Sequence, residues 1–168
     1  MSNAVEKRKK ILKIIIENPG AGFLDIQKNT GYGHGNLSHH LKTLEQEGSI
    51  RIRREKRKVW VFDSASDPNY DRFWMFLRKE TCKKILIFLL EERFASFAHI
   101  RDAIKKSPGT TSTTIKTLME KKLIKKIPGF PDIYTLEDYE KTKKIIDRMN
   151  VSQTDELKDR FVDTFSYY

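Results

Sequence analysis

The segment from Arg51 to Lys58 carries six basic side chains and one acidic side chain in eight residues. Like charges repel one another, so such a cluster favours an anionic partner that offsets the repulsion. Guanidinium and ammonium groups bind phosphate oxygens well, and the segment therefore indicates contact with a polyphosphate backbone. Its basic residues are Arg51, Arg53, Arg54, Lys56, Arg57 and Lys58.

The residues just before this segment predict a helix over His34–Gln46. Leu37, Leu41 and Leu44 recur at the spacing of one helical face, which would be buried. The opposite face would carry Gly35, Asn36, His39, Lys42 and Thr43. Amide, ammonium and hydroxyl groups can bond to base edges in the major groove of DNA. Such a face alone is equally typical of a solvated helix, but the adjoining basic segment favours nucleic-acid binding.

An internal repeat organises the elements that would position these residues. Shifted by 74 positions, the sequence aligns with itself without gaps, so that Lys9–Leu12 falls on Lys83–Leu86 and Lys42–Leu44 on Lys116–Leu118. Apolar positions match over some forty-five residues, and matched apolar positions imply matched cores. The repeat predicts two copies of one domain in the chain.

Each copy shows helical periodicity in three segments and then alternation of period two. The first copy predicts helices over Glu6–Glu17, Phe23–Thr30 and His34–Gln46, and strands over Ile50–Arg53 and Lys58–Phe62. The second predicts helices over Thr81–Glu92, Phe97–Lys106 and Pro108–Lys121, and strands over Leu123–Ile127 and Ile133–Leu136. Three helices followed by a hairpin is the order of a winged helix-turn-helix. The predicted fold class is mainly α with small β-hairpins (α+β), namely tandem winged helix-turn-helix domains plus C-terminal helices.

Turn and capping residues support these bounds. Ser96 is a plausible N-cap, and Ser107-Pro108 pairs an N-cap with proline at the first helical position. The glycine-rich turn Gly31-Tyr32-Gly33 would end the helix over Phe23–Thr30, and Gly48 fits the left-handed position that ends a helix.

The predicted domains are an N-terminal winged helix over 5–63, a linker and connecting helix over 64–78, a C-terminal winged helix over 79–136 and a C-terminal helical extension over 137–168. The extension would hold two helices, and the second, opening near Ser152, places Leu157, Phe161 and Phe165 on one narrow stripe. That stripe favours either packing within the chain or formation of a homodimer.

The second copy departs from the first in its candidate contact residues. The matching helix face carries Thr110, Thr113 and Lys116, which are polar but less cationic. Its hairpin keeps Lys125 and Lys126, but the tip is Pro128–Asp132. The second copy is therefore expected either to add DNA contacts or to mediate assembly.

The stretch around Ser38 resembles winged-helix regulators of the ArsR and MarR type from archaea and bacteria. Those families carry a similar Ser-x-His-Leu-x-x-Leu-x-x-x-Gly signature, which here is Ser38, His40, Leu41, Leu44 and Gly48. The resemblance implies a DNA-binding transcriptional regulator, usually a homodimer, with this helix in the major groove and the hairpin, or wing, on the backbone. Positions that commonly face DNA there are Asn36, Ser38, His39 and Lys42. The resemblance covers about sixty residues, and the second copy matches the signature more weakly. Two such domains in one chain depart from the usual single-domain members of these families.

Composition agrees with a polyanionic partner, since the net charge is +10 and the pI about 9.6. No apolar stretch approaches ~20 residues, and Cys82 is the one cysteine, so neither a membrane span nor an intramolecular disulfide is expected. We expect a cytoplasmic, nucleoid-associated protein that binds double-stranded DNA.

Three other functions have less support in the sequence than DNA binding. Tandem winged helices also serve as protein-interaction scaffolds in transcription or other macromolecular assemblies, and this alternative stays open. Metal sensing by His34, His39 and His40 is disfavoured because no cysteine lies near them. Catalysis has the least support, since neither a nucleotide-binding glycine loop nor a nucleophile motif occurs. No enzyme activity and no cofactor are expected.

Overall fold

The computed structural model describes residues 2–149. The chain divides into two compact units, and the boundary along the sequence lies between Asp71 and Arg72. No helix among the described residues has the length and apolar character that crossing a bilayer requires.

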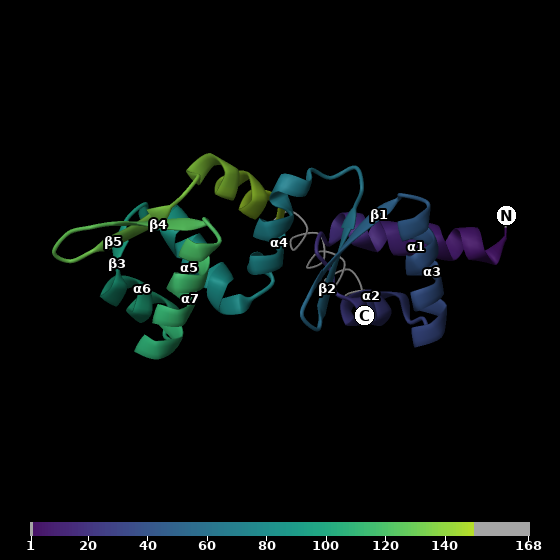
Figure 1. The fold of residues 1–168 in the computed structure, drawn as a ribbon, viewed down its shortest axis with the longest axis horizontal. Coiled ribbons are helices and arrows are strands. Elements are labelled where there is room, and N and C mark those ends of the chain that lie inside the picture. Colours follow the sequence, from purple (N-terminus) through teal and green to yellow (C-terminus); the bar gives the residue numbers. More distant parts are fainter. Residues whose placement is uncertain (1, 150–168) are drawn as a thin grey trace, which may run out of the picture. The chain divides into compact units, whose positions relative to one another are not determined.

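The first unit is a group of helices followed by a two-stranded hairpin (Figure 1). Its elements are α1 (Asn3–Glu17), α2 (Phe23–Thr30), α3 (His34–Gln46), β1 (Ile50–Glu55), β2 (Lys58–Asp63) and the short 3-10 helix η1 (Pro68–Tyr70). The predicted bounds of α2 and α3 are confirmed, and α2 is followed by Gly31, whose φ is 73°. Gly48 follows α3 with a φ of 74°, as a residue at that left-handed position should.

One apolar cluster holds this unit together. It takes one face from each helix and the inward side of the hairpin: Ile11, Ile15, Ala21, Ile26, Leu37, Leu41, Leu44, Ile50 and Val61. The three leucines of α3 are each at most 5% exposed, so the opposite face of α3 is turned to solvent. Burial of the leucine stripe therefore fixes which side chains of α3 can meet a partner.

The hairpin pairs antiparallel from Ile50↔Asp63 to Glu55↔Lys58, with Lys56 and Arg57 in the turn. Side chains alternate between its two faces, so Ile50 and Ile52 lie on the side of the core and Arg51 on the other. Ala21 extends the hairpin by an isolated bridge to Val61. This bridge ties the start of α2 to the strand that supports the wing.

The second unit has the same order of helices and hairpin, with additions. Its elements are α4 (Asp71–Leu77, whose first residue belongs to the first unit), α5 (Glu80–Glu92), β3 (Ala95–Ser96), α6 (Phe97–Ile104), α7 (Pro108–Glu120), β4 (Ile124–Ile127), β5 (Ile133–Leu136) and a helix over 139–149. The strands form one sheet in the order β3-β5-β4. The Ser96 and Ser107 caps are confirmed, since their side chains accept from the amides of His99 and Thr110.

The fold class is confirmed: the described chain is mostly helical with small antiparallel hairpins, as in a winged-helix α+β fold. The structure adds β3, which the sequence analysis lacked. In the division into compact units, η1 and the residues between β2 and η1 belong to the first unit. The predicted helix near Ser152, with Leu157, Phe161 and Phe165, lies outside the described residues.

Candidate nucleic-acid interface

The solvent face of α3 presents the polar residues that the sequence singles out. Asn36, His39 and Lys42 are exposed, while Ser38 and Thr43 are half-buried beside them. The Thr43 hydroxyl donates to the backbone oxygen of His39 at 3.0 Å. Its only proton is thereby used, so outward it offers a methyl group and an acceptor rather than a donor.

His40, which the sequence left between core and exterior, is buried at 5% exposure. Its Nδ1 has no hydrogen-bond partner among the described residues. Burial lowers the pKa of His40, and the nearby charges of His39, Lys7 and Arg8 lower it further. His40 is therefore a neutral residue on the buried side of α3, away from its solvent face.

Arg54 of the wing is bound to the helix that precedes it. Its two terminal nitrogens donate to Glu45 Oε1 and Oε2, both at 3.0 Å. This bidentate pair joins β1 to the last turn of α3. The hydrogen bonds from Arg54 lower the pKa of Glu45, so the carboxylate stays charged. Arg54 thus fixes the wing against α3 in addition to adding charge.

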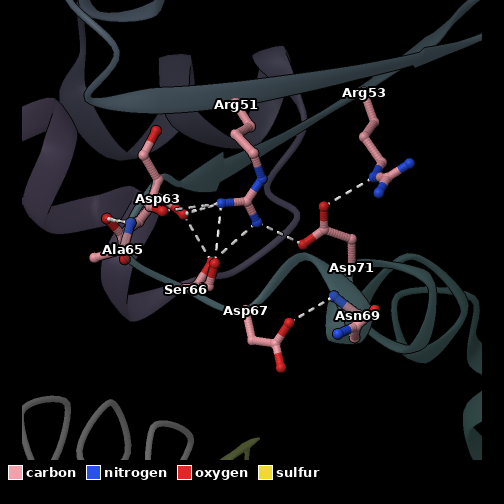
Figure 2. A network of polar contacts seen from close by, with 9 residues as sticks. Arg51, Arg53, Asp63, Ala65, Ser66, Asp67, Asn69 and Asp71 are labelled. Carbon is pink, nitrogen blue, oxygen red and sulfur yellow. Dashed lines mark hydrogen bonds and ion pairs between the residues drawn. The ribbon is translucent and has the colours of Figure 1, made fainter.

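Arg51 lies at the centre of a polar network at the base of the wing (Figure 2). Its Nη1 approaches the backbone oxygens of Asp63, Ser64 and Ser66 at 2.9, 3.2 and 3.0 Å. Its Nη2 donates to Asp71 Oδ1 at 2.8 Å. These contacts hold the turn after β2 and η1 against the hairpin, which is why that segment belongs to the first unit.

Asp71 joins a second wing arginine to this network. Arg53 Nε donates to Asp71 Oδ2 at 2.8 Å, and the Asp71 side chain is 1% exposed (Figure 2). Arg53 itself keeps 50% of its side chain exposed. Two guanidinium groups therefore share one buried carboxylate.

The remaining wing cations gather at the hairpin tip. Lys56, Arg57 and Lys58 are all exposed, and within residues 2–149 none has an ion-pair partner. The six basic residues thus fall into two groups. Arg51, Arg53 and Arg54 have acidic partners within the chain, whereas the tip cations retain their full charge for an outside anion.

Sequence reasoning missed a further basic group on α1. Tyr32 lies in the turn between α2 and α3. The ammonium groups of Lys7 and Lys10 lie 5.6 and 5.5 Å from the centroid of its ring. Lys7 and Arg8 also lie near enough to α3 to lower the pKa of His40. The run of four basic residues from Lys7 to Lys10 was the available signal. It extends the positive field around the helix-turn-helix.

The second unit presents a different surface. Thr110, Thr113 and Lys116 are exposed on α7, and the Ser107 hydroxyl donates to Thr110 Oγ1 at 3.0 Å. At the hairpin tip Phe130 is fully exposed. No group of three His, Cys, Asp or Glu side chains that could hold a metal ion occurs anywhere in residues 2–149.

The chain is similar to several known proteins. Residues 6–51 match the model of a winged helix-turn-helix DNA-binding family. Over 100 residues the chain is 28% identical to the uncharacterized HTH-type transcriptional regulator MJ1398 of Methanocaldococcus jannaschii, a match that spans 60% of this chain and 24% of that protein. The chain therefore covers about a quarter of this relative's length.

Two solved structures are also similar. One is the hypothetical protein PyrSV_gp04 of Pyrobaculum spherical virus, at 15% identity and a TM-score of 0.41, covering 80% of this chain and 95% of that one. The other is the C30AH42A mutant of ZitR from Lactococcus lactis, at 18% identity and a TM-score of 0.42, covering 79% and 94%. The match to the family model covers α1 from Glu6 onward, α2, α3 and the start of β1.

Proposed function

We propose that this chain is a double-stranded DNA-binding transcriptional regulator of the ArsR/MarR type. In this proposal α3 lies in the major groove and the β1–β2 hairpin lies on the phosphate backbone. The regulator would act at the nucleoid in the cytoplasm, without a cofactor and without enzyme activity.

The observation that carries the proposal is the pairing of the exposed polar face of α3 with an uncompensated cationic tip, Lys56–Lys58, on the adjoining hairpin. Each phosphate that a cation neutralises releases counterions from the duplex, which strengthens binding without regard to sequence. Sequence preference must come from side chains that reach base edges. The first unit offers both kinds of group from neighbouring elements.

The roles divide according to the contacts within the chain. Asn36, His39 and Lys42 are exposed on α3 and are assigned to base edges, with Ser38 and Thr43 at the margin of the contact. Lys56, Arg57 and Lys58 are assigned to phosphates. Arg51 and Arg54 act chiefly by holding the wing in place, because their guanidinium groups already have partners.

The second unit extends this proposal as a second winged helix in tandem with the first. Its α7 would add contacts to the same duplex through Thr110, Thr113 and Lys116, whose side chains are exposed. The C-terminal extension would join two chains into a homodimer.

Selection of preferred duplexes from a random pool, followed by titration of variants, tests the assignment of α3. The double variant Asn36→Ala/His39→Ala should lose roughly tenfold in preference for the selected duplex over a shuffled one. Its dependence on salt should match that of the wild type, because phosphate contacts are intact. A variant that keeps the full preference would contradict the placement of α3 in the major groove.

A protein-interaction scaffold is the second candidate function, and one observation favours it for the second unit. The tip of the second hairpin presents a fully exposed Phe130 where the 74-residue repeat places Lys56 in the first. Lys126 of the same hairpin is paired with Asp132 at 3.3 Å. An apolar tip with little net charge is better suited to a protein surface than to phosphates. Phe130→Ser should leave duplex affinity unchanged if this unit binds protein, and lower it if the tip meets DNA.

A further inference from the structure

We propose that Asp71 is a positioning residue for DNA binding, whose buried carboxylate orients Arg53 toward a backbone phosphate. The inference rests on the proposed function and adds to it a residue that makes no contact with DNA. Because Asp71 is acidic, its charge alone would oppose DNA binding, whereas the proposed role supports it.

The carboxylate of Asp71 is itself held in place. Its side chain is 1% exposed, and Oδ1 accepts a hydrogen bond of 2.8 Å from Arg51. Arg51 is anchored in turn by the backbone oxygens of Asp63, at the end of β2, and of Ser64 and Ser66 in the turn that follows (Figure 2). A chain of contacts therefore runs from the turn through Arg51 to Asp71, and leaves Oδ2 in a defined position.

Oδ2 is the atom that acts on Arg53. It accepts from Arg53 Nε at 2.8 Å, which fixes the direction of the guanidinium plane. The two terminal nitrogens of Arg53 have no partner within residues 2–149, and half of the side chain is exposed. These nitrogens form the edge of the fork that binds two phosphate oxygens at once. The arginine is thus oriented before DNA arrives.

The charges are consistent with this role. Arg51 and Arg53 carry two positive charges and share the one negative charge of Asp71. Both ion pairs are 2.8 Å long, but the Arg51 side chain is 26% exposed and that of Arg53 is 50% exposed. Arg53, on the outer side of the carboxylate, remains attractive to an anion, and holding it in one orientation reduces the rotamer freedom that phosphate binding would otherwise remove.

Two accounts of Asp71 predict effects of opposite sign, which makes the test sharp. If Asp71 only adds negative charge near the wing, its removal should tighten DNA binding. If Asp71 orients Arg53, its removal should weaken binding, although the protein becomes more positive. The control is Asp67→Asn, since Asp67 is exposed, lies in the same segment, and bonds to the backbone of its own turn (Figure 2).

The experiment is a double-mutant cycle on the full chain with a labelled random-sequence duplex. Asp71→Asn should lower duplex affinity roughly fivefold, and should lower it no further once Arg53→Gln is present. Asp67→Asn should bind as the wild type or slightly more tightly. Equal losses from Asp71→Asn in both backgrounds, or tighter binding of Asp71→Asn, would overturn the inference.

Folding is checked by thermal melting of each variant, and Arg53→Lys gives an independent readout. Lysine keeps the charge, but it lacks the Nε–H that Asp71 orients and the two terminal nitrogens that bind two phosphate oxygens at once. Arg53→Lys should therefore lose most of the duplex affinity that Arg53→Gln loses, whereas wild-type affinity of Arg53→Lys would overturn the inference. If the wild type itself ignores duplex DNA, the proposed function fails; if it binds and Asp71→Asn behaves as Asp67→Asn, only the role of Asp71 fails.

Discussion

Glu45 in the last turn of α3 accepts two parallel hydrogen bonds from Arg54 of β1, each 3.0 Å long. The helix assigned to the major groove and the strand that carries the wing are therefore joined directly by side chains. With Arg51 and Arg53 held by Asp71, the strand is fixed on both of its faces. The wing tip is thus presented by a braced hairpin.

The Glu45–Arg54 pair should contribute stability only above the pH range in which glutamate ordinarily titrates. Hydrogen bonds from Arg54 lower the pKa of Glu45 in the folded state, so the unfolded state takes up a proton first as the pH falls. The contribution is present above about pH 4.3, the ordinary value for glutamate, and is lost as the pH falls through the folded-state pKa. Thermal melting of the wild type and Glu45→Gln should show the wild type more stable at pH 7 and the two converging near pH 3. A constant difference would contradict the pairing.

His40 should give a separate dependence on pH at higher values. Burial lowers its pKa in the folded state, so below the ordinary value of about 6.5 the unfolded state binds a proton that the folded state does not. Stability should therefore decrease as the pH falls from 6.5 toward the folded-state pKa. Melting curves of His40→Gln should lack this decrease between pH 7.5 and 5.5. Parallel curves for wild type and variant would show that His40 is not buried as a neutral group.

Substitution of Lys56 should weaken DNA binding without lowering the stability of the fold. It occupies the hairpin turn with a φ of 54°, a left-handed conformation that strains side chains other than glycine. Lys56→Gly should leave the free energy of unfolding unchanged or raise it by up to about 1 kcal/mol, while weakening duplex binding through the lost cation. Lys122, at a φ of 56° after α7, gives the matched control. Lys122→Gly should change the free energy of unfolding as Lys56→Gly does, but should not weaken duplex binding, because Lys122 is not part of the first wing. Unfolding by urea and duplex titration check the two effects.

Arg51 and Arg57 carry the same charge but should respond differently to removal. Arg51→Gln breaks hydrogen bonds to the turn and leaves buried Asp71 with one arginine fewer, at a cost of about 2 kcal/mol in the free energy of unfolding. Arg57→Gln, at the exposed tip, should stay within about 0.5 kcal/mol of the wild type. Equal stabilities in urea unfolding would contradict the structural role of Arg51.

The order of elements and several bounds were predictable because their signals are local. The leucine stripe of α3, the glycine at position 48 and the Ser107-Pro108 cap all act within a few residues along the chain, and each is confirmed. β3 was not predictable, because two residues are too short for a period, and Ala95 pairs with Tyr134 far along the chain.

The chemistry of the wing was predictable only in part. Its total charge is visible in the sequence, but the charge that remains for a partner depends on pairing through space. Asp71 lies 18 residues from Arg53 and Glu45 lies nine from Arg54, and no spacing rule connects such positions across a turn. The structure therefore reduces a cluster of six cations to three at the tip whose charge has no partner in the described chain.

The most direct measurement of the central claim is the salt dependence of binding to a labelled random-sequence duplex. The triple variant Lys56→Gln/Arg57→Gln/Lys58→Gln is compared with the wild type, and Lys84→Gln/Lys143→Gln/Lys144→Gln, also exposed, gives the same change in net charge elsewhere. We predict that the wing variant binds more weakly and that its slope of log affinity against log salt is shallower by about 2.7, while the control resembles the wild type. Identical slopes for the wing variant and the wild type, or no binding of the wild type at low salt, would contradict the claim.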